Sequence, residues 1–180
     1  MALKSTVFRA ELQISDMDRN YYQNHVVTVA RHPSETNERM MMRILAFILN
    51  ASEHLTFASG LTSNDEPDLW EKDLTGSITL WIMVGLPDEK MIKRACGRAK
   101  NVIIYSYGGT AAEIWWSSLS KSLKASNISV INITHAESTA LADLAERTMK
   151  IQATVQDGII WLSSAGITLE INPLFWLRVL

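Results

Sequence analysis

The stretch "ITLWIMVGLPDEKMIKRACGR", residues 78–98, contains the change of pattern that decides the fold. Its first part is rich in β-branched and aromatic residues, which are typical of a buried strand. The pattern breaks at Gly85 and Pro87 and continues as a basic segment with helical spacing. We therefore expect a strand over residues 77–85 that is followed directly by a helix over residues 88–99.

The same alternation continues along the chain. Apolar runs predict strands over residues 102–107 and 128–133, and segments with helical spacing predict helices over residues 110–124 and 137–148. A strand–helix–strand–helix–strand order indicates adjacent parallel strands joined by right-handed crossovers. Further on, Asp157-Gly158 separates two strand-like runs and predicts a hairpin near the carboxyl end.

The amino-terminal part adds a second hairpin and a helix. In "KSTVFRAELQI" apolar and polar residues alternate, and a short turn leads into a second strand, "YYQNHVVTVA". A helix is predicted over residues 35–53, with Ser34 as its cap. We expect an α/β fold in which one mixed β-sheet is flanked by helices and is extended by an N-terminal and a C-terminal hairpin.

Composition limits the class of protein. The 180 residues, of which 47% are hydrophobic, predict one domain over residues 1–180. The chain has a single cysteine, Cys96, and shows neither a signal peptide nor an apolar run that could span a bilayer. We therefore expect a cytoplasmic protein without membrane contact. Because the net charge is −2, a site for nucleic acid would have to be a local basic patch.

Six motifs spread over the chain carry a resemblance to a known family: "RHPSETNERM" (31–40), "DEPDLW" (65–70), "LWIMVGLPDE" (80–89), "RACGRA" (94–99), "YSYGG" (105–109) and "IQATVQDGIIWLS" (151–163). The sequence resembles the bacterial YaeQ family throughout. That resemblance implies a variant of the PD-(D/E)XK fold of restriction endonucleases, with the nuclease-like core at about residues 35–108. It supports the fold more strongly than it supports an activity.

The resemblance also implies a set of acidic site residues. Glu66, which precedes a proline, matches the first acidic metal ligand of the nuclease superfamily, and its neighbour Asp68 could share or replace it. Glu38 matches a glutamate that many of these nucleases place beside the metal, and Glu35 lies one turn earlier on the same helix. The implied cofactor is Mg²⁺ or Mn²⁺. The alternative is that the helical acids favour the helix dipole and that the loop acids are solvated.

The chain departs from the family pattern in the strand over residues 77–85. Met83 stands where the resemblance implies a second acid, and Gly85 stands where it implies a lysine. A cation could instead come from the following helix, at Lys93 or Arg94. Because strand residues alternate between two sides, we expect Met83 to face Glu66 and Glu38, while Ile82 and Val84 pack beneath a helix.

Basic residues allow an anionic partner. Arg31 and His32 precede the first predicted helix, where backbone N–H groups can hold a phosphate, although His32 also suits a simple turn. The helix over residues 88–99 and the residue after it carry five basic side chains: Lys90, Lys93, Arg94, Arg98 and Lys100.

Two functions remain open at this stage. One is metal-dependent hydrolysis of nucleic acid, and the other is a non-enzymatic binding or regulatory module that retains the fold. A dinucleotide-binding enzyme is disfavoured because "YSYGGTAAE" lacks the G-x-G-x-x-G spacing.

Overall fold

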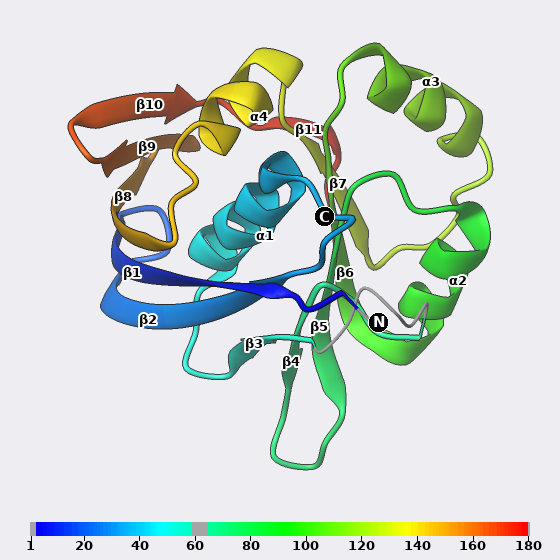
Figure 1. Ribbon diagram of the computed structural model, residues 1–180. Coiled ribbons are helices and arrows are strands. Elements are labelled where there is room, and N and C mark those ends of the chain that lie inside the picture. Colours follow the sequence, from blue (N-terminus) through cyan, green and yellow to red (C-terminus); the bar gives the residue numbers. More distant parts are fainter. Residues whose placement is uncertain (1–2, 59–64, 180) are drawn as a thin grey trace. The chain divides into compact units, whose positions relative to one another are not determined.

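The computed structural model describes residues 3–58 and 65–179. These residues form an α/β fold with two mixed β-sheets and four helices (Figure 1). The chain divides into two compact units with one sheet each. The first unit consists of Met1–Leu49 and Ala136–Pro173, and the second of Asn50–His135 and Leu174–Leu180. The expectation of one domain over residues 1–180 stays a prediction.

The sheet of the first unit has five strands in the order β10-β9-β8-β1-β2. The strands are β1 (Thr6–Asp16), β2 (Tyr21–Arg31), β8 (Thr148–Gln156), β9 (Ile159–Ser164) and β10 (Ile167–Ile171). β1 and β8 run parallel, and the other neighbours run antiparallel. The expectation of one common sheet is therefore wrong. Each hairpin has one apolar side, and the two hairpins bury these sides together in a sheet of their own.

Both predicted hairpins are present in this sheet. β1 and β2 pair without interruption over eleven residues, from Thr6 opposite Arg31 to Asp16 opposite Tyr21. β8 and β9 are joined by Asp157-Gly158, whose φ angles are +53° and +75°. A two-residue turn of this kind requires positive φ at both positions, which glycine and aspartate tolerate best. The local turn signal in the sequence is thus confirmed.

The first unit also contains α1 (Asn37–Asn50), whose last residue is assigned to the second unit. The Phe47 ring meets the His25 ring of β2 edge to face at 5.2 Å, so this helix packs on the inner side of the sheet. The predicted cap at Ser34 is wrong. Instead, the hydroxyl of Thr36 accepts a hydrogen bond from the backbone N–H of Arg39 at 3.1 Å, and the helix begins at the next residue.

The sheet of the second unit has six strands in the order β11-β7-β6-β5-β4-β3. The strands are β3 (Leu55–Phe57), β4 (Leu69–Lys72), β5 (Ile78–Val84), β6 (Ala99–Ser106), β7 (Ile128–Asn132) and β11 (Leu174–Leu177). β5, β6 and β7 are adjacent and parallel, so the predicted strand–helix–strand pattern is confirmed. β3, β4 and β11 pair antiparallel at the two sides of this group.

The remaining helices begin close to the predicted positions but end earlier. α2 (Glu89–Arg98) is capped by Asp88, whose carboxylate accepts from the N–H of Met91 at 2.8 Å. α3 (Thr110–Leu119) was expected to continue to residue 124. It ends at Leu119, where the hydroxyl of Ser122 donates to the carbonyl oxygen of Leu119 at 2.9 Å and competes with the helical pattern.

α4 (His135–Ala142) was expected to reach residue 148, but Thr148 already begins β8. Among residues 3–58 and 65–179, no helix is long and apolar enough to cross a bilayer.

The core of the second unit explains how α2 is held. Trp81 and Met83 of β5 belong to one apolar cluster with Ile92 and Ala95 of α2, and Ile82 and Val84 lie outside that cluster. The alternation of sides along β5 is therefore confirmed. α2 packs on the side of Met83, and Ile82 and Val84 are also buried, so both sides of β5 are covered. The expectation that Ile82 and Val84 pack beneath a helix stays a prediction.

Candidate functional site

The acidic segment before β4 lies at the end of β5. One carboxylate oxygen of Asp68 accepts a hydrogen bond from the backbone N–H of Val84 at 2.7 Å. The backbone continues the pairing, because the N–H of Asp68 donates to the carbonyl oxygen of Ile82 at 3.0 Å. Glu66 is half-buried two residues earlier. The structure thus places Asp68 where the chain pairs with β5, with Glu66 two residues before it, and it gives Asp68 a role in fixing that pairing.

Met83 does not form part of an open site. Its side chain is 5% exposed and lies among the apolar side chains of α2, β6 and β7. The expectation that Met83 faces Glu66 and Glu38 stays a prediction. At this position the chain uses a flexible apolar side chain to fill its core.

The basic candidates on α2 have separate partners. Arg94 donates to the carboxylate of Asp65 at 2.6 Å, which ties α2 to the acidic segment. Lys93 pairs with Glu89 at 2.6 Å on the exposed surface of the helix. The hydrogen bond and the charge of Lys93 lower the pKa of Glu89. The ion pair with Asp65 thus holds Arg94 beside the predicted acidic segment. Asp65 itself was not among the predicted site residues.

Glu38 and Glu35 belong to the first unit and have structural partners there. The hydroxyl of Ser138 in α4 donates to Glu38 at 2.6 Å. Glu35 is 7% exposed, and its two oxygens accept from the guanidinium of Arg43 at 2.8 and 2.7 Å. Arg39 donates to Glu35 at 3.0 Å. Glu35 is therefore the centre of a buried ion-pair group.

The predicted phosphate site before α1 is occupied by internal contacts. Arg31 donates to the side-chain oxygen of Asn37, and its guanidinium lies 5.2 Å from the centre of the Phe8 ring. The Nδ1 atom of His32 contacts the hydroxyl of Ser34 at 2.6 Å and accepts from the N–H of Ser34 at 3.1 Å. These contacts match the turn interpretation of His32.

The acidic residues do not fit a magnesium or manganese centre. Such ions require several oxygen ligands in near-octahedral geometry, and a thioether is a poor ligand for them. Within the described part of the chain, no three His, Cys, Asp or Glu side chains are grouped so that they could hold a metal ion. Met83 removes one carboxylate from the set that the resemblance implies, and the Asp68 carboxylate already holds a backbone N–H.

A groove in the second unit has a lining with a net positive charge. It lies between α2 and the segment 120–127, and its cavity has a volume of about 1020 Å³. Its charged lining consists of Lys93, Lys121, Lys124 and Glu89, so its net charge is +2. We call it the lysine groove. Within residues 3–58 and 65–179, neither Lys121 nor Lys124 has a hydrogen bond or an ion pair.

The walls of the lysine groove are fixed by Asn127. Its side-chain amide donates to the carbonyl oxygens of Cys96 and Ala99 at 3.1 and 3.0 Å. This satisfies two carbonyls at the end of α2, so the neighbouring lysines are not needed to complete the helix end. Burial raises the pKa of the Cys96 thiol, which makes this lining residue a weak nucleophile.

Sequence reasoning identified Lys93 but missed Lys121 and Lys124. The available signal was the segment "SKSLKASN", residues 120–127, in which lysines alternate with small polar residues between a helix and a strand. Such segments are often solvated loops, and only the fold brings this one beside α2.

Comparison with known proteins identifies the family. The family model described as YaeQ protein matches residues 1–173. The chain is 46% identical to the YaeQ protein of Salmonella typhi and 45% identical to that of Escherichia coli K12, over 98% of each chain in both cases. The crystal structure of YaeQ from Xanthomonas axonopodis pv. citri is similar with a TM-score of 0.94 and 43% identity, covering 97% of this chain and 99% of that one. The YaeQ structure from Pseudomonas syringae has a TM-score of 0.89 and 31% identity, covering 97% of both chains. The chain therefore belongs to the YaeQ family.

Proposed function

We propose that the protein is a non-enzymatic module that binds nucleic acid through the lysine groove of its second unit. The observation that carries this proposal is the pair Lys121 and Lys124, whose ammonium groups face one groove with Lys93 and have no partner among the described residues. Three ammonium groups against one carboxylate give a local positive field in a chain whose net charge is −2.

The chemistry of the lining suits a phosphodiester backbone. Lysines supply point charges for phosphates, and the Ser126 hydroxyl in the lining supplies a neutral donor. Glu89 already neutralises Lys93 in part, so Lys121 and Lys124 are expected to dominate the attraction. A polyanion would gain affinity chiefly by releasing counterions from its phosphates.

The finer fold assignment, a variant of the PD-(D/E)XK arrangement, is part of this proposal. Its support is the order in which β3, β4 and β5 form an antiparallel meander, followed by α2 and the parallel strand β6. In such a domain the substitution of Met83 for an acid favours a binding protein over a hydrolase.

Metal-dependent hydrolysis of nucleic acid is the second candidate. One observation favours it: Asp68 lies at the end of β5, and Asp65 draws Arg94 of α2 to the same acidic segment. Mg²⁺ or Mn²⁺ would be the required cofactor, and Glu66 and Asp68 would be its ligands. The poor fit of the described residues to such a centre makes this the weaker candidate.

The test is a binding titration of a fluorescein-labelled single-stranded oligonucleotide, followed by anisotropy at several salt concentrations in the presence of a chelator. We expect Lys121→Ala and Lys124→Ala each to weaken binding and to reduce the slope of log K against log salt by about 0.7. Lys72→Ala is the matched control, because Lys72 is an exposed lysine of the same unit that lies over the Trp70 ring, outside the groove.

Two results would contradict the proposal. Equal losses in all three variants would show that binding is not located at the lysine groove. Cleavage of the oligonucleotide in Mg²⁺ or Mn²⁺ that is lost on Glu66→Ala would replace the binding proposal with hydrolysis.

A further inference from the structure

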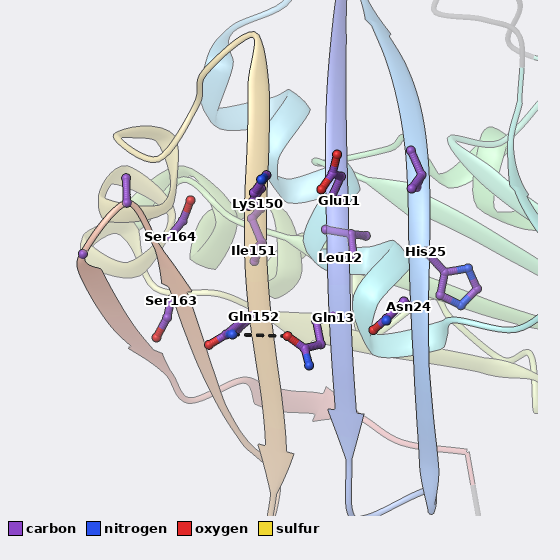
Figure 2. A pocket seen from close by; sticks show the side chains of 13 residues that line it. Glu11, Leu12, Gln13, Asn24, His25, Lys150, Ile151, Gln152, Ser163 and Ser164 are labelled. Atoms are coloured by element: carbon purple, nitrogen blue, oxygen red, sulfur yellow. Dashed lines mark hydrogen bonds between the residues drawn. The ribbon is translucent and has the colours of Figure 1, made fainter.

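The outer face of the sheet in the first unit, opposite the side that packs on α1, contains a second cavity with a volume of about 620 Å³ (Figure 2). Its lining comes from the middle of β1, β2 and β8 and from the turn between β9 and β10. Amides and hydroxyls dominate the polar part of the lining, which contains Gln13, Asn24, Gln152, Ser163 and Ser164.

These groups are arranged in one row across the sheet. Gln13 is paired with Asn24 on one side and with Gln152 on the other, and the row continues to Ser163 and Thr168. Figure 2 shows the hydrogen bond of 3.2 Å from the Gln152 amide to the Gln13 amide, and a second bond of 3.0 Å joins Ser163 and Thr168. Four inter-strand steps of about 4.8 Å make this row about 19 Å long.

The neighbouring row on the same face contains two aromatic side chains. Ser15 is paired with Tyr22 and with Thr154, and Thr154 is paired with Trp161. Tyr22 is 53% exposed, and Trp161 is half-buried. Three inter-strand steps place these two aromatic residues about 14 Å apart. Tyrosine and tryptophan combine a flat apolar surface with a polar group, which suits ligands that have both characters.

The charges of the cavity are nearly balanced. Glu11 forms an ion pair of 2.6 Å with Arg9 on the same strand. Lys150, opposite Glu11 in the register, is the one lining charge without a counter-ion among the described residues. A single lysine is too little for a phosphate polymer, whose binding depends on several cations. The lining is matched instead to a ligand that is rich in hydroxyl groups and carries no charge.

We propose that this face binds an uncharged oligosaccharide along the row from Asn24 to Thr168. The side-chain amides of Gln13 and Gln152 would each donate to and accept from sugar hydroxyls. Tyr22 and Trp161 would contact the apolar faces of the sugar rings. The proposal does not rest on the nucleic-acid function proposed for the second unit, since all of its residues belong to the first.

The row differs from an ordinary solvated sheet surface. Such surfaces commonly carry long charged side chains, and in this cavity these are confined to Glu11 and Lys150 of the adjacent row, whereas the row itself has only amides and hydroxyls. The side-chain amide of Asn24 has no hydrogen bond with any of the described residues, although it can make several. The row therefore has unused hydrogen-bonding capacity that faces the cavity.

The experiment is calorimetric titration of the full chain with a panel of neutral oligosaccharides, namely the tetrasaccharides of glucose in α and β linkage, of mannose, of galactose and of N-acetylglucosamine. We expect at least one to bind and to change the tryptophan fluorescence. Gln152→Ala should weaken that binding by about fivefold, the loss expected for about one neutral hydrogen bond. Gln156→Ala is the matched control, because Gln156 is an exposed glutamine on the same strand and face but outside the cavity.

Three results would overturn the proposal. They are the absence of binding by the whole panel at millimolar concentration, equal losses for Gln152→Ala and Gln156→Ala, and displacement of the sugar by a single-stranded oligonucleotide. The last result would assign this face to nucleic acid. Loss of oligonucleotide binding at the lysine groove would leave the sugar titration unaffected, so the two proposals fail separately.

Discussion

Substitution of Met83 by glutamate tests whether β5 carries a disabled metal site or a packed core. The Met83 side chain is 5% exposed, and its neighbours Ile92, Ala95 and Ile104 are completely buried. A carboxyl group placed there has no partner among these apolar side chains, so it would remain protonated in the folded state. The variant is therefore expected to lose stability in a manner that depends on pH.

The size of the loss follows from two contributions. Holding the new carboxyl neutral near pH 7, about 2.7 units above its ordinary pKa of about 4.3, costs about 3.7 kcal/mol. Burying the neutral group without a hydrogen bond adds about 1–3 kcal/mol. The expected total of about 5–7 kcal/mol is comparable with the entire stability of many domains, which begins at about 5 kcal/mol.

The sign with pH follows from the raised pKa of the introduced carboxyl. The stability lost by keeping the introduced carboxyl protonated is zero below the pKa of that carboxyl in the unfolded chain. The loss grows as the pH rises above this value, until the pH reaches the pKa of the carboxyl in the folded protein. The deficit of the Met83→Glu variant relative to the parent should therefore shrink by about 3.7 kcal/mol between neutral pH and about pH 4.

The assay is urea unfolding followed by tryptophan fluorescence, with Met83→Leu as the control. The control keeps nearly the same volume and should lose less than about 1.5 kcal/mol. Magnesium should not restore the glutamate variant, because the position faces the core. A stable Met83→Glu protein, or one whose unfolding midpoint rises in millimolar magnesium or manganese, would refute this reasoning and would restore the metal-site interpretation.

Three further predictions concern the first unit. Glu35→Gln leaves the guanidinium of Arg43, which is 5% exposed, without its carboxylate and should cost about 3–5 kcal/mol in urea unfolding; a loss below about 1 kcal/mol would show that water solvates the pair. Ser138→Ala removes the hydrogen bond to Glu38 and should lower the stability by about 1.5–3 kcal/mol in the same assay, and an unchanged midpoint would mean that the bond contributes nothing. Burial lowers the pKa of the His25 side chain in the folded protein below its ordinary value of 6.5. The stabilising contribution of the neutral His25 is therefore complete above pH 6.5 and is lost as the pH falls through the lower pKa of the folded state. An NMR titration in which His25 has its ordinary pKa would contradict this.

Features that depend on neighbouring residues could be predicted from the sequence. The turn at Asp157-Gly158 and the helix start at Asp88 follow from backbone preferences and from short-range hydrogen bonds. The parallel group of β5, β6 and β7 follows from the alternation of strands and helices. Each of these signals lies within one element or between two consecutive elements.

Features that depend on distant pairing could not be predicted. The alternation in β1 identifies an apolar side but does not name β8, more than a hundred residues away, as its parallel partner. The two sides of β5 were recognised, but the sequence contains no signal for which side α2 would cover. Lys121 and Lys124 became part of a site only because Asn127 joins their segment to the end of α2.

The position of Met83 connects the core of the second unit to its groove. One side of α2 packs Ile92 and Ala95 against Met83, and Lys93 lies in the lining of the lysine groove. A carboxylate on this side of β5 would have to draw in a metal ion or water, and both would weaken the apolar contact that fixes the helix. With methionine at this position, the side of α2 that faces β5 is held by apolar packing, while the Arg94–Asp65 ion pair and the Asn127 amide hold the helix elsewhere. Methionine at this position and a basic groove along α2 both agree with the proposed binding function.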